Sequence, residues 1–143
     1  MNSLAGLRNF RAGTGTHWQD TQVLIKNDMR FVTSWDYEPL FKMLGAKRFD
    51  YIIRGAQEIW SELALHPDID LAAEQQLLLR YQQPVYFFVR PGNTELAMRI
   101  LEGLELAEKD GSLETLIISV PGFQKAREEI RNKDRRIIDL IPG

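Results

Sequence analysis

The sequence predicts a three-layer α/β domain, in which helices cover both faces of a mostly parallel five-strand sheet of flavodoxin-like topology. Short apolar runs alternate with longer amphipathic segments through the first half of the chain. Three consecutive strand–helix units of this length imply right-handed crossovers and a parallel sheet. The chain of 143 residues, 44% hydrophobic and 27% charged, is large enough for one core. We expect one domain over residues 1–143: a core lobe at 1–91, and a C-terminal helical segment at 92–143 that packs on it or is exchanged with a partner chain.

The first half of the chain supplies three predicted strands, at 7–12, 29–34 and 49–53, and the three helices that follow them, at 16–26, 37–45 and 56–66. Helical spacing is clearest in the second helix, where four apolar residues recur three or four apart: Tyr37, Leu40, Phe41 and Leu44. Gly45 can cap the end of that helix, and Pro67 stops the next one.

The pattern changes in the second half. Residues 76–81 and 85–90 are both strand-like, and the three residues between them are too few for a crossover helix. They form either a hairpin or one long bent strand that passes between two regions. Residues 94–110 carry one apolar stripe and predict a long helix that Gly111 caps. A charged helix is expected over 123–136.

Composition excludes several classes of protein. A net charge of −2 gives no electrostatic reason to expect nucleic acid as a partner. No apolar run is long enough for membrane insertion, and the first residues lack the pattern of a secretory signal. We therefore expect the chain as given to be cytoplasmic, or periplasmic if it is cut from a longer exported precursor.

The most informative stretch is residues 10–21, where an apolar run breaks at two glycines and a helix follows. A helix N-terminus at the end of a strand offers free N–H groups and a favourable dipole to an anion. This predicts a ligand-binding turn made of Gly13, Thr14, Gly15 and Thr16. The alternative is a tight strand-to-helix turn that needs glycine for its backbone angles.

Three further residues are candidates for ligand binding. His17 adjoins the turn, as a ligand contact or base, or as a capping residue. Arg54 follows the third strand, at the sheet edge where ligands bind in open α/β folds, and can hold a carboxylate by two hydrogen bonds. The alternative for Arg54 is a salt bridge with Glu58, the third candidate.

No complete catalytic signature is present. The chain has no cysteine, only two histidines, and no lysine after the glycines. These features argue against a thiol nucleophile, a histidine-rich metal site and a Walker-type phosphate loop. We expect no catalysis, no cofactor and no metal.

Several strings in the chain resemble type II periplasmic solute-binding proteins, namely the family 3 extracellular solute-binding proteins of the polar-amino-acid type. The similarity covers the second lobe and the C-terminal part of that family, without the N-terminal half of its first lobe. The strings that carry it are Gly13-Thr14-Gly15-Thr16-His17-Trp18-Gln19-Asp20-Thr21, Leu40-Phe41-Lys42-Met43-Leu44, Arg48-Phe49-Asp50-Tyr51, Arg54-Gly55-Ala56-Gln57-Glu58-Ile59, Pro84-Val85-Tyr86-Phe87-Phe88-Val89 and Arg135-Arg136-Ile137-Ile138-Asp139-Leu140.

The resemblance implies a non-catalytic module that binds a small polar solute, either a carboxylate or an amino-acid-like molecule. Residues 13–16 match the loop that holds a ligand carboxylate in those relatives, and residues 54–58 fall where they place an acidic group for the ligand amine. Without the first lobe, the apolar stripe of the helix at 94–107 needs other cover, which predicts a homodimer. The alternative function is a stand-alone interaction or oligomerisation domain that has lost ligand binding.

Overall fold

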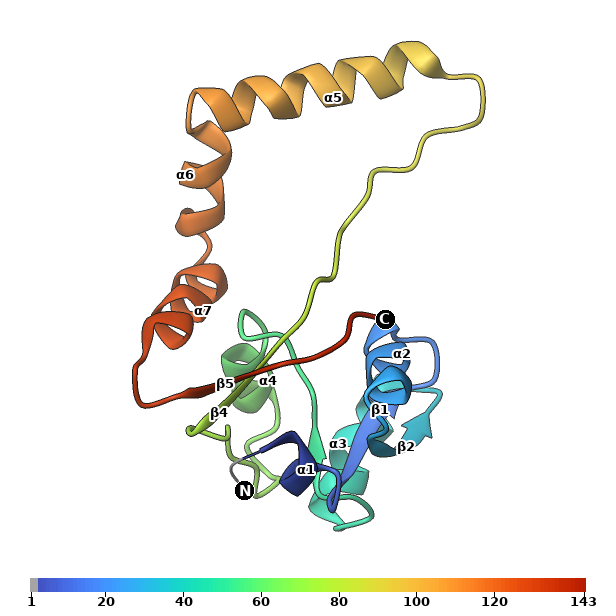
Figure 1. Ribbon diagram of the computed structural model, residues 1–143, viewed down its shortest axis with the longest axis vertical. Helices are drawn as coiled ribbons and strands as arrows, with labels where there is room; N and C mark the ends of the chain where they lie inside the picture. The colour runs from blue at the N-terminus through green and yellow to red at the C-terminus, as the bar shows by residue number, and fades with distance from the viewer. Residues whose placement is uncertain (1–2) are drawn as a thin grey trace.

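A computed structural model describes residues 3–143 as a mixed α/β structure with two small parallel sheets (Figure 1). The elements, in chain order, are α1 (Leu4–Leu7), β1 (Arg11–Gly15), α2 (Gln19–Lys26), β2 (Arg30–Ser34), α3 (Tyr37–Gly45), β3 (Tyr51–Ile52), α4 (Ile59–Leu65), β4 (Leu77–Arg80), α5 (Thr94–Lys109), α6 (Ser112–Ser119), α7 (Pro121–Arg131) and β5 (Arg136–Asp139).

The five strands do not form one sheet. Three of them pair in the order β2-β1-β3, and β4 pairs in parallel with β5. The predicted single five-strand sheet is therefore divided. β3 contributes only two ladder positions, where Tyr51 lies opposite Ala12 and Ile52 opposite Gly13, so it presents little edge on which a fourth strand could pair.

Both sheets nevertheless share one core. Its buried side chains come from both ends of the chain and from α2: Leu7, Ala12, Val23, Leu24, Met29, Ile138 and Leu140. Asn27 fastens the C-terminal residues to α2, because its side chain bonds both the carbonyl and the N–H of Ile141, at 2.9 and 3.0 Å. Residues after 91 thus complete the core as well as forming helices.

The predicted strand at 7–12 is wrong in its position. Residues 4–7 form α1 instead, because the Ser3 hydroxyl accepts the Gly6 N–H at 3.1 Å and caps that short helix. β1 starts at Arg11 and continues through Gly15, where its ladder with β2 still holds. The glycines expected in a loop therefore lie in a strand.

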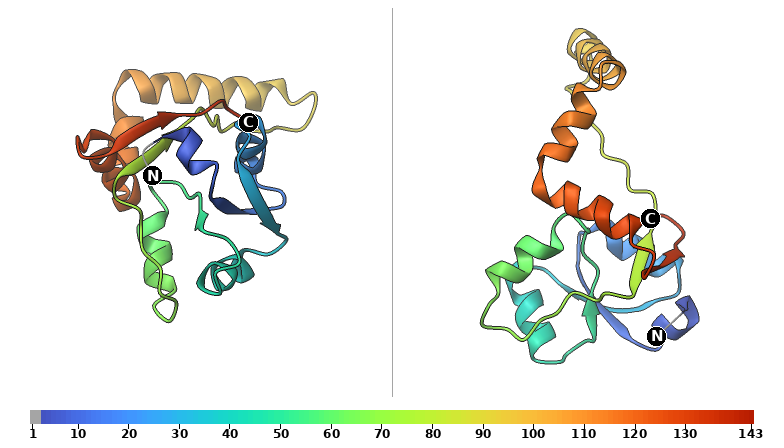
Figure 2. Two further views of the ribbon diagram at one scale, coloured as in Figure 1. Left: turned by 60° about the horizontal axis from the view of Figure 1, so that its bottom comes forward. Right: turned by 90° about the vertical axis from the view of Figure 1, so that its left-hand side faces the viewer.

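The second half differs more from the expectation. Both the hairpin and the single bent strand are wrong, because β4 pairs with β5 and residues 81–90 form no strand. Those residues run as an extended connection toward α5, as Figures 1 and 2 show. The charged helix expected over 123–136 ends at Arg131, and Arg136 already belongs to β5.

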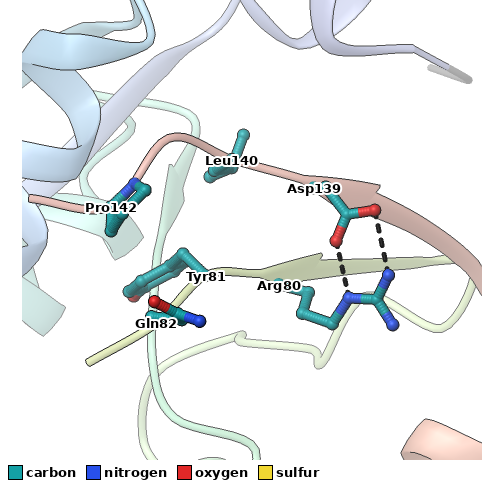
Figure 3. A pocket seen from close by; sticks show the side chains of 6 residues that line it. All are labelled: Arg80, Tyr81, Gln82, Asp139, Leu140 and Pro142. Carbon is teal, nitrogen blue, oxygen red and sulfur yellow. Dashed lines mark hydrogen bonds and ion pairs between the residues drawn. The ribbon is translucent and has the colours of Figure 1, made fainter. Parts of the chain in front are cut away.

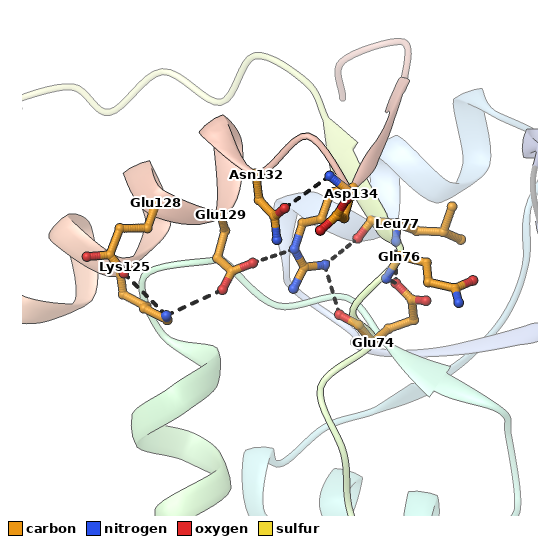
Figure 4. A network of polar contacts seen from close by, with 9 residues as sticks. Glu74, Gln76, Leu77, Lys125, Glu128, Glu129, Asn132 and Asp134 are labelled. Carbon is orange, nitrogen blue, oxygen red and sulfur yellow. Dashed lines mark hydrogen bonds and ion pairs between the residues drawn. The ribbon is translucent and has the colours of Figure 1, made fainter.

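α5 and α6 contain no buried residue, and they lie away from the sheets (Figure 1 and Figure 2, right). α7, by contrast, packs on the rest of the structure, with Gly122 against the backbone of Gln57 and Ala126 buried. Arg135 donates to the carboxylate of Glu129 in α7 and to the carbonyl oxygens of Glu74 and Leu77 at 2.8 Å (Figure 4). This nearly buried guanidinium therefore joins α7 to the beginning of β4.

Candidate functional site

Side chains that follow four different strands converge at one edge of the structure. Trp18 follows β1, Tyr37 follows β2, Arg54 follows β3 and Tyr81 follows β4. Ligands in open α/β sheets bind beyond the carboxyl ends of the strands, where such residues meet. We call the following residues the carboxyl-edge cluster: Trp18, Asp20, Tyr37, Arg54, Glu58, Glu62 and Tyr81.

Arg54 lies at the centre of this cluster. Its guanidinium carbon is 4.5 Å from the ring centroid of Trp18 and 5.7 Å from that of Tyr37. Its Nε donates to Glu62 at 2.8 Å, and its Nη2 contacts both Glu62 and, at 3.0 Å, Glu58. The side chains of Arg54 and Glu62 are only 15% and 11% exposed. Two rings and two carboxylates therefore hold one guanidinium in a fixed orientation.

The pKa values around Arg54 follow from this enclosure. Burial alone would lower the pKa of Arg54, but the hydrogen bonds and charges of Glu62 and Glu58 hold it above its ordinary value. Burial and the neighbouring Glu62 raise the pKa of Tyr37 to about 12. Burial and the hydrogen bond to Asp20 raise the pKa of Tyr81. Both phenols thus stay neutral at physiological pH.

These shifts predict a loss of stability at high pH. Tyr37 and Tyr51 have pKa values of about 12 in the folded chain, against about 10 in an unfolded one. The folded state binds these protons more tightly, so the contribution is complete below pH of about 10 and disappears as the pH rises toward about 12. We expect the free energy of unfolding, measured in urea, to fall over this interval and to fall less steeply in Tyr37→Phe. An equal fall in both proteins would contradict the shift at Tyr37.

The structure pairs Arg54 with Glu58 in a salt bridge, which is the alternative that the sequence offered for Arg54. It also places Glu62 on the same guanidinium. Glu62 lies one turn beyond Glu58 on α4 and is 8% exposed. The four-residue spacing of Glu58 and Glu62 in the sequence indicates that both carboxylates lie on one helix face, although such a polar pair is usually solvated. Asp20 and Tyr81 had no local signal, because 61 residues separate them.

The run from Gly13 to Thr16 lies beside the cluster, with its polar groups already bonded. Thr14 is 2% exposed and shares a hydrogen bond with Thr21 at 3.0 Å. The N–H and the hydroxyl of Thr16 both donate to the carbonyl of Ser34, at 2.9 and 3.1 Å. The N–H of Trp18 donates to the carbonyl of Gly15. These donors are therefore already used in hydrogen bonds at the end of β1 and at the start of α2.

Both glycines of this run make close contacts with aromatic rings. A Cβ on Gly13 would lie 2.3 Å from the Phe49 ring, and one on Gly15 would lie 2.4 Å from the Trp18 indole. Neither glycine has a positive φ, so ring packing and not a left-handed turn requires them.

His17 lies edge-on to Trp35, with 4.9 Å between the two ring centroids, and Trp35 is 76% exposed.

One cavity adjoins the cluster through Tyr81. It measures about 360 Å³ and is lined by Arg80, Tyr81, Gln82, Asp139, Leu140 and Pro142 (Figure 3). At its rim, Arg80 donates two hydrogen bonds, of 2.6 and 2.9 Å, to the carboxylate of Asp139. A second cavity, between Leu44 and Ala72, lies apart from the cluster. Within residues 3–143, no three histidine or acidic side chains gather as a metal ion would require.

Comparisons of the chain with protein-family models, curated proteins and solved structures find no match. No helix among the described residues is long and apolar enough to cross a membrane.

Proposed function

We propose that the carboxyl-edge cluster binds a small polar solute of the amino-acid type, and that the chain is a non-catalytic, three-layer solute-binding lobe of the type II kind. The observation that carries the proposal is the enclosed Arg54. Its Nη1 donates to no group within residues 3–143, and each guanidinium Nη carries two N–H donors. A ligand carboxylate can therefore accept hydrogen bonds from a guanidinium that Glu62 already orients.

The charge balance of the cluster favours a positive group elsewhere on the same ligand. Two carboxylates, of Glu58 and Glu62, contact the one guanidinium of Arg54, and a third, of Asp20, accepts a hydrogen bond from Tyr81 in the same cluster. Glu58 is the accessible one, with its side chain 44% exposed. An ammonium group beside Glu58, with a carboxylate on Arg54, matches the two ends of an amino acid.

Thermal unfolding with four probes tests this proposal: glutamine, lysine, succinate and putrescine. The two amino acids should raise the Tm saturably, since a ligand at 100 times its Kd stabilises the fold by about 2.7 kcal/mol. Succinate and putrescine, which each lack one of the two groups, should act at least tenfold more weakly. Glu58→Gln should abolish the shift, whereas Glu95→Gln, an exposed change on α5, should retain it. No saturable shift with either amino acid would contradict the proposal.

A second function, self-association as a homodimer, is favoured by a different observation. α5 and α6 bury nothing, and several of their apolar side chains are 40% to 64% exposed. Large exposed apolar surfaces on soluble proteins usually mark interfaces. Sedimentation equilibrium at tens of micromolar tests this, with a dimer expected and a monomer contradicting it.

A further inference from the structure

Residues 85–89 are the most unusual surface of the structure. They run extended between β4 and α5, and their four leading side chains are 69% to 92% exposed: Val85, Tyr86, Phe87 and Phe88. Within residues 3–143, the backbone groups of 82–89 have no hydrogen-bond partner. An extended, apolar and unpaired segment is a template for pairing with another strand.

The composition of this segment indicates that both of its faces become covered. Alternating polar residues mark a strand with one solvated face, whereas a continuous apolar run is typical of a strand buried on both faces. Val-Tyr-Phe-Phe-Val has no polar position, and all five residues favour strands. A partner must therefore supply both backbone groups and apolar side chains.

A second copy of the chain can supply the backbone groups and apolar cross-strand neighbours. When two copies are placed antiparallel about a two-fold axis at Phe87, Val85 lies opposite Val89 and Tyr86 lies opposite Phe88. Aromatic pairs directly across two strands are stabilising. No charge lies between Pro84 and Val89, so no like charges meet, and Pro84, which has no N–H, falls outside the paired run. The segment is thus complementary to itself.

The area available is of the size that a stable dimer needs. An aromatic side chain buries about 150–250 Å², and Tyr86, Phe87 and Phe88 are more than two-thirds exposed. These three residues alone supply about half of the roughly 800 Å² per partner of a standard interface. α5 adds exposed apolar side chains beyond the segment: Leu96, Met98, Leu101 and Leu106.

We propose that residues 85–89 of two copies pair as antiparallel strands about a two-fold axis at Phe87. The proposal rests on the self-association stated above and names its contact. Because the pairing is symmetric, Phe87 is the residue that meets its own counterpart. Every other position of the segment meets a different residue.

Cysteine crosslinking tests this register, since the chain has no cysteine of its own. Phe87→Cys places two thiols on directly opposite residues, within the Cα separation of about 4.4–6.8 Å that a disulfide spans. Val85→Cys is the matched control, because two copies of that residue would be about 14 Å apart along the ladder. We expect rapid oxidation to a covalent dimer for Phe87→Cys alone. Equal crosslinking of both variants, or none at Phe87→Cys, would overturn the register.

Charge pairing at the same position gives a second test. Phe87→Lys sets like charges opposite each other and should raise the dimer Kd by about 30-fold or more, as should Phe87→Glu. Mixing the two variants should restore association, and Leu65→Lys, an exposed change at the end of α4, should leave it unchanged. A monomeric wild type would overturn self-association itself. A wild-type dimer that Phe87→Lys does not weaken, with rapid hydrogen exchange at 85–89, would overturn the strand pairing only.

Discussion

Replacing Glu62 with alanine is expected to lower the free energy of unfolding by about 3 kcal/mol, the effect of removing one partner from a largely buried ion pair. Glu62 accepts hydrogen bonds from Nε and Nη2 of Arg54, and both side chains are at least 85% buried. Without Glu62, the guanidinium stays against the rings of Trp18 and Tyr37 and keeps only the more exposed Glu58. Urea unfolding at neutral pH measures the loss.

Glu58→Ala is the matched control for this variant, since it removes the other carboxylate from the same arginine. The Glu58 side chain is 44% exposed, so water screens its charge and the change should cost less than about 1 kcal/mol. If Glu58→Ala and Glu62→Ala lowered the free energy of unfolding equally, the prediction would be wrong, because the buried contact would contribute no more than the exposed one. Glu62→Gln, which retains hydrogen-bonding atoms without the charge, should fall between them.

Replacing Gly13 with valine is expected to cost about 3 kcal/mol, at the upper end of the usual range for overpacking a core. The added Cβ would lie 2.3 Å from the ring of Phe49, which is 2% exposed and has little room to shift. Gly13 also pairs with both β2 and β3, so a displacement of β1 would disturb two ladders. Urea unfolding followed by far-ultraviolet circular dichroism measures this effect.

Gly103→Ala serves as the control for the loss of a glycine. A Cβ at Gly103 would meet nothing within 4 Å, and the residue lies inside α5. Alanine in a helix interior is favoured over glycine, so this change should stabilise that helix by about 0.5–1 kcal/mol. If Gly13→Val were as harmless as Gly103→Ala, the close packing of Phe49 on β1 would be refuted.

Local pattern in the sequence predicts much of the first half of the chain. The helix expected over 37–45 is α3 with the same bounds, and strand 29–34 and helix 94–110 each differ from β2 and α5 by one residue at one end. Apolar spacing and turn residues act within one element, so they can be read without knowledge of its neighbours. The short α1 and the strand β5 had no comparable signal.

For the candidate functional site too, the sequence predicts contacts between near neighbours and not those between distant residues. Arg54 and Glu58 lie four residues apart on the chain, and their pairing could be foreseen. The hydrogen bond from Tyr81 to Asp20 could not be foreseen in this way. The same holds for the rings of Phe49 and Trp18, whose close packing requires glycine at positions 13 and 15. The contacts of Asp20 and Gly13 join residues more than thirty positions apart, and no spacing rule relates them.

The sequence by itself determined the alternation of strands and helices through α3, the long α5 and the place of Arg54 beside Glu58, because these depend on contacts within a few residues. Only the tertiary structure decided the division into two sheets, the burial of Glu62 and the exposed state of residues 85–88. Each of these depends on which distant segment lies alongside. For β4 that segment is β5, and for residues 85–89 nothing among residues 3–143 provides one.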